Sequence, residues 1–406
     1  MKIAIVVQGR FHAFDLARAL IERGNDVTVF TNYPYWAVER FGLPKQRVRT
    51  FPLHGVFARL AGRIQTKTGW CLEPWTHPMF SRWAASQLRE ESWDVIHAWT
   101  GVAEEIYRDP AIKAASRLVM RGSAHIKTQA AILGEESHRV GLPIDQPSKW
   151  MIEREQREYE LADEIIVLST FARSSFRDQG IHDSKLRFLP LGADTRKFRP
   201  TAATIAQRRD RIRSGAPLRV LYVGNVSFQK GIADFCSIIE QAPIDRFRFR
   251  FVGAVTPEAR EIVSRLSTRA DFAGKIPQAE LPLEYARNDL FLFPTIQDGF
   301  AAVLAQASAS ALPILTTENC CGPDLVKEGR TGWVLPIRSP GAFADRLQWC
   351  DAHRPELADM ITAIYSEFRT RDWSDVAADF EAIVSQDAID RQDCLSGSAA
   401  GVSGRR

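Results

Sequence analysis

A segment in the second half of the chain carries side chains that suit the binding of a diphosphate. Asp298 and Gly299 follow the apolar run 290–293, and an alanine-rich stretch begins at Ala301. This order predicts a buried strand, a turn and a helix, whose first free amides point outward with partial positive charge. Asp298 lies just before that helix and Gln306 two turns inside it, so they would address opposite ends of the ligand. An ordinary N-cap followed by a core helix fits the local pattern equally well.

A lysine near the middle of the chain is a second candidate for the same chemistry. Lys230 stands between the glycine-ended apolar run 219–224 and Gly231. A positive charge beside a departing diphosphate stabilises the negative charge that develops on it. A lysine before a glycine is often only a solvated surface residue, but its place after a glycine-ended strand favours a role in binding.

Strands and helices alternate along the chain, which would position these residues at the ends of parallel strands. The predicted strands are 3–7, 27–30, 95–97, 118–120 and 165–168, then 219–224, 247–251, 290–293 and 313–316. Helices are predicted in the second half at 232–241, 257–266, 301–311 and 341–350. Two doubly wound α/β halves of similar length predict a ligand cleft between them, lined by loops at the carboxyl ends of the strands.

Length and composition agree with two globular domains. The chain has 406 residues, 45% of them apolar and 25% charged, and a net charge of only +4, which does not favour a nucleic-acid partner. The first domain is predicted at 1–199 and the second at 200–372. The Ser/Gly/Ala-rich tail, 389–406, is predicted to be disordered.

These motifs resemble those of retaining glycosyltransferase family 4 (glycosyl transferases group 1), whose usual form is E-G-F-G-x-x-x-x-E. Asp298 and Gln306 stand where the family has its two glutamates. The resemblance implies that Asp298 lies by the transferred sugar, that Gln306 holds the ribose, and that amides between them bind the diphosphate. The residues in this stretch are Gly299, Phe300, Ala301 and Ala302.

Other segments match the same family in order along nearly the whole chain. The stretch 223–231 resembles G-R-L-x-x-x-K-G, so that Lys230 and Asn225, the latter in the place of an arginine, would clamp the donor phosphates. The resemblance further implies that Ile276 lies at the base, that His125 touches the donor sugar, and that Gly9 and Arg10 face the acceptor. It also implies a closing helix, about 373–388, that packs back on the first domain.

The resemblance implies a GT-B enzyme that moves a sugar from a nucleotide-diphosphate donor to a hydroxyl acceptor with retention of configuration. No D-x-D, G-x-G-x-x-G or P-loop motif occurs, so neither a metal ion nor another cofactor is expected. Polysaccharide or glycolipid synthesis is the expected role. Two alternatives remain open: a catalytically impaired sugar-nucleotide-binding or scaffold protein, and a sugar-phosphate-forming synthase of the same fold.

The predicted location is the cytoplasm, with peripheral contact at the inner face of the membrane left open. The apolar run 3–7 is too short for an export signal, and the six cysteines form no C-x-x-C pair, which is typical of free thiols rather than a metal site. The stretch 45–83 is basic and rich in tryptophan. It suits either an anionic membrane surface or a solvated acceptor-side surface with buried tryptophans.

Overall fold

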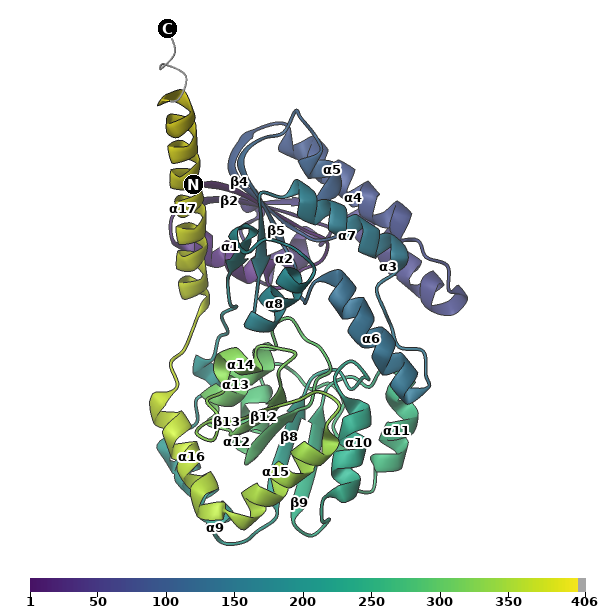
Figure 1. The fold of residues 1–406 in the computed structure, drawn as a ribbon, viewed down its shortest axis with the longest axis vertical. Coiled ribbons are helices and arrows are strands. Elements are labelled where there is room, and N and C mark those ends of the chain that lie inside the picture. The colour runs from purple at the N-terminus through teal and green to yellow at the C-terminus, as the bar shows by residue number, and fades with distance from the viewer. Residues whose placement is uncertain (401–406) are drawn as a thin grey trace.

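Two parallel β-sheets, each covered by helices on both faces, form two domains that follow one another along the longest axis of the molecule (Figure 1). The computed structural model describes residues 1–400, and the side chains of all of these except 66–67 and 387–400. The chain runs through the first domain, then the second, and returns to the first with its last helix.

The first domain contains a seven-stranded sheet. Its order is β3 (Val48–Thr50), β2 (Asp26–Thr31), β1 (Lys2–Val7), β4 (Ser92–Trp99), β5 (Lys113–Met120), β6 (Glu164–Val167) and β7 (Leu186–Phe188). The helices are α1 (Ala13–Glu22), α2 (Tyr35–Glu39), α3 (Pro52–Thr68), α4 (Glu73–Leu88), α5 (Glu104–Tyr107), α6 (Ile126–Val140), α7 (Lys149–Leu161) and α8 (Thr170–Asp178), with short 3₁₀ turns η1 (Lys45–Arg47), η2 (Asp183–Lys185) and η3 (Arg196–Phe198). The central strands are apolar on both faces because helices cover both.

The second domain contains a six-stranded sheet. Its order is β10 (Ala270–Phe272), β9 (Phe247–Val252), β8 (Leu218–Val223), β11 (Leu290–Phe293), β12 (Ile314–Thr317) and β13 (Gly332–Leu335). The helices are α9 (Ala202–Arg213), α10 (Ile232–Gln241), α11 (Arg260–Leu266), α12 (Leu281–Ala286), α13 (Ala302–Ala309), α14 (Gly322–Leu325), α15 (Pro340–Ala352) and α16 (Arg354–Glu367), with η4 (Pro257–Ala259) before α11. The predicted strands all appear, whereas the short strands β3, β7, β10 and β13 were not predicted.

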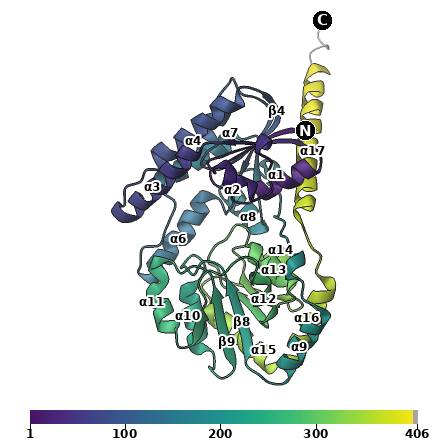
Figure 2. The ribbon, with the colours of Figure 1, turned by 180° about the vertical axis from the view of Figure 1, so that it is seen from behind.

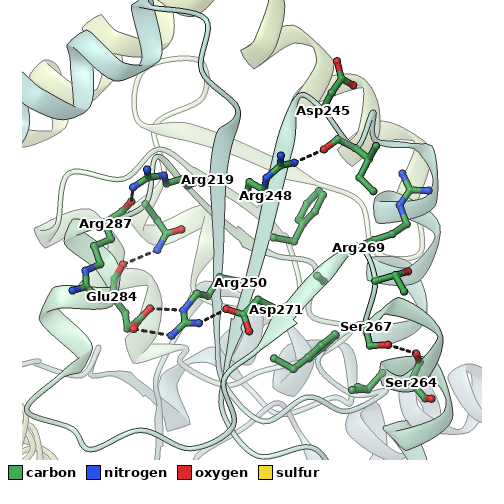
Figure 3. Close-up of a pocket in the computed structure, with 17 residues that line it drawn as sticks. Arg219, Asp245, Arg248, Arg250, Ser264, Ser267, Arg269, Asp271, Glu284 and Arg287 are labelled. Carbon is green, nitrogen blue, oxygen red and sulfur yellow. Dashed lines mark hydrogen bonds and ion pairs between the residues drawn. The ribbon is translucent and has the colours of Figure 1, made fainter.

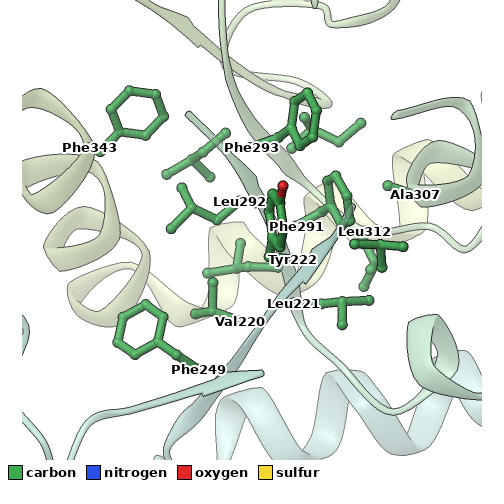
Figure 4. Close-up of a cluster of buried hydrophobic side chains, with 14 of the residues drawn as sticks. Val220, Leu221, Tyr222, Phe249, Phe291, Leu292, Phe293, Ala307, Leu312 and Phe343 are labelled. Carbon is green, nitrogen blue, oxygen red and sulfur yellow. The ribbon is translucent and has the colours of Figure 1, made fainter. Parts of the chain in front are cut away.

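Aromatic rings hold the centre of the second sheet together (Figure 4). Tyr222 from β8 stacks on Phe293 from β11 with ring centroids 5.8 Å apart, and Phe293 lies 6.2 Å from Phe291 on the same strand. Each of these rings is at most 2% exposed. Burial of one such side chain stabilises the fold by about 1.5–3 kcal/mol, so the strands whose ends carry the candidate loops are rigidly placed.

Strand β9, next to the edge strand β10, alternates phenylalanine and arginine because the helices that flank the sheet leave one face of this strand open. Phe247, Phe249 and Phe251 are buried, while the arginines between them line an open hollow of about 1260 Å³ (Figure 3). There Arg250 forms an ion pair with Glu284 at 2.7 Å. The hollow includes Arg219, near the start of β8, and Ala270, the first residue of β10, so it extends to the end of the sheet opposite the candidate loops.

The last helix, α17 (Trp373–Ala400), packs on the first domain beside the N-terminus (Figures 1 and 2). Val376, Ala377, Phe380 and Val384 join the core that contains Ile3 and Phe14. Arg23 and Glu381 form an ion pair of 2.7 Å at its edge. The predicted tail, 389–406, overlaps this helix over 389–400, and 401–406 lie outside the described residues.

Candidate active site between the two domains

Loops at the carboxyl ends of both sheets meet and enclose a cleft of about 400 Å³. Gly299 touches the first domain so closely that a Cβ there would lie 2.2 Å from the carbonyl oxygen of Gly122. Gln297 also donates a hydrogen bond to Ser123 across the boundary. The first domain contributes to the lining Phe11, His12, His77, Trp99, Thr100, Arg121, Gly122, Ser123, Gln129, Met151, Glu155, Leu168 and Leu191, and the second contributes Gln229, Asp298, Gly299 and Phe300.

Lys230 lies just outside the cleft lining and contacts Asp298, which is part of it. The Nζ atom of Lys230 lies 2.6 Å from Oδ2 of Asp298 and 3.4 Å from the carbonyl oxygen of Gln297, to which it donates. Both charged side chains are about one-fifth exposed. The ammonium is therefore accessible to a ligand, and in this structure the Asp298 carboxylate balances its charge.

A glycine makes this approach possible. Gly231 has φ +83°, and a Cβ there would lie 1.9 Å from the carbonyl oxygen of Pro294. The loop after β8 can therefore press against the end of β11 only with glycine at this position. That contact brings Lys230 to the loop that carries Asp298.

Helix α13 begins directly after this loop. Ala301 precedes its first residue, Ala302, and supplies no side-chain cap, so no side chain of the N-cap satisfies the first amides. Gln306 lies within the helix, and its Oε1 accepts a hydrogen bond of 3.0 Å from the buried Tyr285 hydroxyl. The helix start and Gln306 thus stand in the order that the sequence predicts.

Asn225 and Ile276 lie at the same end of the second sheet but outside the cleft lining. Asn225 is exposed, and its carbonyl accepts a hydrogen bond of 2.7 Å from Tyr222. Ile276 follows β10 and packs, half-buried, against the domain core. The structure therefore places Asp298, Gly299 and Phe300 in the lining and Lys230 in contact with Asp298, whereas no contact joins Asn225 or Ile276 to this group in the described structure.

His125 is a helix cap in this structure. Its Nδ1 accepts a hydrogen bond of 3.2 Å from the amide of Lys127 at the start of α6, and its ring packs between Tyr159 and Phe176 at 5.0 Å from each. Burial lowers the pKa of its ring to about 4. His125 lies outside the cleft lining and supports the loop of Gly122 and Ser123, which does line it.

The two predicted acceptor-side residues, Gly9 and Arg10, are not part of the cleft lining. The Gly9 amide donates to Asn32 Oδ1 at 2.9 Å. Arg10 lies over the Phe41 ring, 3.8 Å from its centroid, and pairs with Asp15 at 3.3 Å. The next two residues of the same loop, Phe11 and His12, line the cleft instead.

Sequence reasoning missed a polar cluster on the first-domain wall. Arg121 follows β5, and its Nε lies 3.0 Å from Oε2 of Glu155 on α7, which also accepts a hydrogen bond of 2.6 Å from the Tyr159 hydroxyl. Burial raises the pKa of Glu155. The position of Arg121 at the end of a predicted strand was an available signal, whereas nothing local in the sequence marks Glu155.

Among the side chains that the structure describes, no three of His, Cys, Asp or Glu gather in a way that would hold a metal ion. No helix in the described part of the chain has the length and apolar character needed to cross a membrane.

Two family models match consecutive parts of the chain. The model for Glycosyltransferase Family 4 matches residues 10–197, and the model for Glycosyl transferases group 1 matches residues 217–351. The matches coincide with the first and the second domain.

Curated relatives carry related names. The chain is 26% identical over 253 residues to a GDP-mannose-dependent alpha-mannosyltransferase of Corynebacterium glutamicum, covering 62% of this chain and 57% of that protein. It is 24% identical over 268 residues to a GDP-mannose-dependent alpha-(1-6)-phosphatidylinositol monomannoside mannosyltransferase of Mycobacterium tuberculosis, covering 62% and 66%. The matched region thus spans between half and two thirds of these relatives.

Solved structures share the whole fold. Sucrose-phosphate synthase from Thermosynechococcus elongatus superimposes with a TM-score of 0.69 at 19% identity, covering 98% of this chain and all of that one. HepE of Anabaena, in complex with UDP and glucose, gives 0.66 at 15% identity, covering 95% and 99%. With both domains matched by family models and both sheets shared with these structures, the chain belongs to the group 1 glycosyl transferases of glycosyltransferase family 4 and has the GT-B fold.

Proposed function

We propose that this protein transfers a sugar from a nucleotide-diphosphate donor to a hydroxyl group of an acceptor. The observation that carries the proposal is the ion pair between Lys230 and Asp298 just before the start of α13, with Asp298 lining the cleft between the domains. A cation and a helix N-terminus without a side-chain cap are groups that suit a diphosphate. They lie at the carboxyl ends of β8 and β11, where ligands bind in doubly wound sheets.

The donor diphosphate would replace the Asp298 carboxylate as the ion-pair partner of the Lys230 ammonium. As the bond between the sugar and the diphosphate breaks, negative charge grows on the leaving group, and Lys230 together with the α13 amides would stabilise it. Under this proposal these groups supply the positive charge, so transfer needs no Mg²⁺. Gln306, held by Tyr285, would bind the ribose hydroxyls through its amide.

Asp298 would then be free to act on the sugar. Once the diphosphate binds Lys230, the carboxylate 2.6 Å away loses its partner and can accept hydrogen bonds from hydroxyls of the transferred sugar. The acceptor oxygen forms its bond to the anomeric carbon as the bond between that carbon and the diphosphate oxygen breaks, and the proton of the acceptor hydroxyl passes to the leaving diphosphate. We propose retention of configuration, in line with the family motif that Asp298 and Gln306 match.

The acceptor is proposed to belong to a polysaccharide or glycolipid pathway at a membrane surface. Helix α3 presents an apolar stripe to solvent, with Leu53 78% and Leu60 49% exposed, and Arg59 and Arg63 are exposed on the same helix. Trp70 and Trp75, in the link to α4 and at its start, are both about 70% exposed. An apolar stripe with basic residues suits an anionic bilayer.

Vesicle sedimentation tests the membrane contact. Wild type should pellet with phosphatidylglycerol vesicles and not with phosphatidylcholine vesicles, and Leu60→Ser should lose this binding. Leu283→Ser removes a leucine that is 50% exposed on the second domain and should pellet like wild type. Equal loss in both variants, or no pelleting of wild type, would refute the contact.

A donor panel tests the transferase. GDP-mannose, named in both relatives, and UDP-glucose are offered with EDTA present, and slow donor hydrolysis is measured. Hydrolysis of one donor should survive EDTA and fall at least about a hundredfold in Lys230→Ala, the range seen when one stabilising group of a transition state is removed. Lys327→Ala, an exposed lysine of the same domain, should behave like wild type. Donor binding without turnover would favour the scaffold alternative, and absence of binding would contradict the proposal.

A further inference from the structure

An exposed aromatic ring stands in a strained backbone position at the edge of the cleft. Phe11 has φ +41°, one of three non-glycine residues with positive φ among the residues that the structure describes. Its ring is 65% exposed and lines the cleft on the first-domain side. An L residue reaches this conformation only when the surrounding structure imposes it, and such residues gather at functional sites.

The neighbours of Phe11 impose the strain. Gly9 is held on one side by its hydrogen bonds with Asn32 and Thr31. His12 is held on the other side, with Nε2 2.9 Å from the sulfur of Met120 and its ring 5.2 Å from that of Trp99. His12 is thereby fixed against the interior, and the chain turns the side chain of Phe11 outward.

Phe11 in this arrangement contributes little to the stability of the fold. A ring that stabilises a domain is buried, as Phe14 is in the next helix, at 0% exposure. Phe11 instead combines a strained backbone with a largely solvated ring. Strain combined with exposure points to a ligand that covers the ring.

The surroundings define the chemistry of that ligand. A flat apolar ring with polar groups near it suits a sugar, whose ring has an apolar C–H face and a rim of hydroxyls. Thr100 and Gln129, both partly exposed, line the cleft on the same side and carry hydrogen-bonding groups. The ring projects from the first domain, across the cleft from the loop of Asp298.

We infer that Phe11 is a platform for the acceptor, and that the acceptor is itself a sugar residue rather than a bare lipid alcohol. This inference rests on the proposed transfer, in which the second domain holds the nucleotide and the transferred sugar. Phe11 would contribute to acceptor affinity and specificity without touching the diphosphate.

Acceptor kinetics test it, with the donor that the panel selects. The acceptor probes are methyl glycosides of mannose, glucose and galactose, compared with diacylglycerol in mixed micelles. Wild type should transfer to at least one glycoside. Phe11→Ala should raise the KM for that glycoside about tenfold, a change typical of a lost aromatic contact, and alter the KM for the donor by less than about twofold. Phe11→Tyr should keep the wild-type KM, whereas Phe11→Leu should resemble the alanine variant.

Controls separate this inference from the function on which it rests. Trp36→Ala removes another exposed aromatic ring of the first domain, 62% exposed and outside the cleft lining, and should leave the KM for the glycoside unchanged. No donor turnover by wild type would mean that the proposed function is wrong. Turnover with transfer to diacylglycerol alone or to no glycoside, or equal KM values in Phe11→Ala and Trp36→Ala, would overturn the role of Phe11 alone. An equal rise in donor and acceptor KM would place the ring on the transferred sugar and also overturn it.

Discussion

At the scale of single residues, the ion pair between Lys230 and Asp298 explains why two ordinary side chains can form a site. Each is only about one-fifth exposed, and the ion pair holds both side chains in place. A diphosphate carries more charge than one carboxylate and can displace it. Under the proposed function, the pair would therefore link donor binding to release of Asp298.

This link predicts opposite effects on binding and turnover. Asp298→Asn should raise the affinity for the free nucleoside diphosphate a few-fold, because Lys230 no longer has a competing anion within the protein. The same change should lower kcat at least about tenfold, because the sugar loses a charged acceptor. Calorimetry with GDP or UDP measures the affinity, and donor hydrolysis measures kcat. Asp345→Asn, at an exposed position, is the control. Weaker nucleotide binding in Asp298→Asn would contradict the competition.

A buried histidine gives a prediction for pH. His97 is fully buried, with no hydrogen-bond partner for its ring nitrogens in the described structure, and burial, followed by the nearby His12, lowers its pKa to about 3. The unfolded chain binds a proton at this side chain below pH 6.5 while the folded chain does not, so its contribution to stability falls as pH falls from 6.5 toward 3. As the pH falls through that window, the free energy of unfolding of His97→Leu should rise relative to that of wild type by about 1.4 kcal/mol per pH unit. Urea unfolding at pH 7.5 and 5.5 measures this, and a constant difference would contradict it.

At the scale of elements, the loops at the carboxyl ends of the second sheet contain glycines with a backbone conformation that other residues rarely adopt. Gly231 and Gly274 both have positive φ, but only Gly231 faces a backbone atom where a Cβ would stand. Substitutions at these two positions therefore distinguish the cost of a positive φ from the cost of a steric clash with the backbone.

Alanine at these two positions should have unequal effects. Gly274→Ala should cost about 1 kcal/mol of stability, the cost of a left-handed residue in open space. Gly231→Ala should cost at least about 2 kcal/mol more, and it should also weaken donor binding because Lys230 moves with its loop. Urea unfolding and nucleotide titration check both. Equal stability in the two variants would mean that the loop adapts without moving the lysine.

The sequence predicts these elements where the information is local. Unbroken apolar runs predict strands such as β1 and β11, and the strand order places Lys230 and Asp298 in neighbouring loops. The role of α3 is harder to predict, because its apolar stripe suits a buried helix equally well. Phe11 and Glu155 enter the cleft through tertiary contacts alone. His125 has a local role that the family motif does not reveal, since its capping bond to Lys127 depends on the backbone at the start of α6.

At the scale of the whole molecule, charged contacts join the two domains on one side of the cleft. Arg338, in the second domain, has φ +56° and reaches α6 of the first. It pairs with Glu136 at 3.0 Å and with Glu135 at 2.7 Å, and it donates to the carbonyl oxygen of Ile132 at 2.8 Å. Since α6 follows the loop of Gly122 and Ser123, this contact helps to set the width of the cleft.

Removal of this contact should lower the fraction of molecules in which the two domains hold their closed arrangement. Arg338→Ala should increase the radius of gyration in solution scattering and lower kcat/KM for the donor by about three- to tenfold, because less of the protein holds the closed arrangement. Arg330→Ala breaks an exposed pair with Glu367 inside the second domain and should do neither. Unchanged scattering in Arg338→Ala would show that the interface does not depend on this arginine.

The return of α17 to the first domain makes that domain discontinuous in the chain. Its core needs Val376, Ala377 and Phe380, which leave the ribosome only after the entire second domain has been made. The second domain is thus complete in the nascent chain before the first, although it begins some 200 residues later. During synthesis the surface of α1 that will receive α17 stays uncovered throughout, so the part of the protein made first is the last that can finish folding.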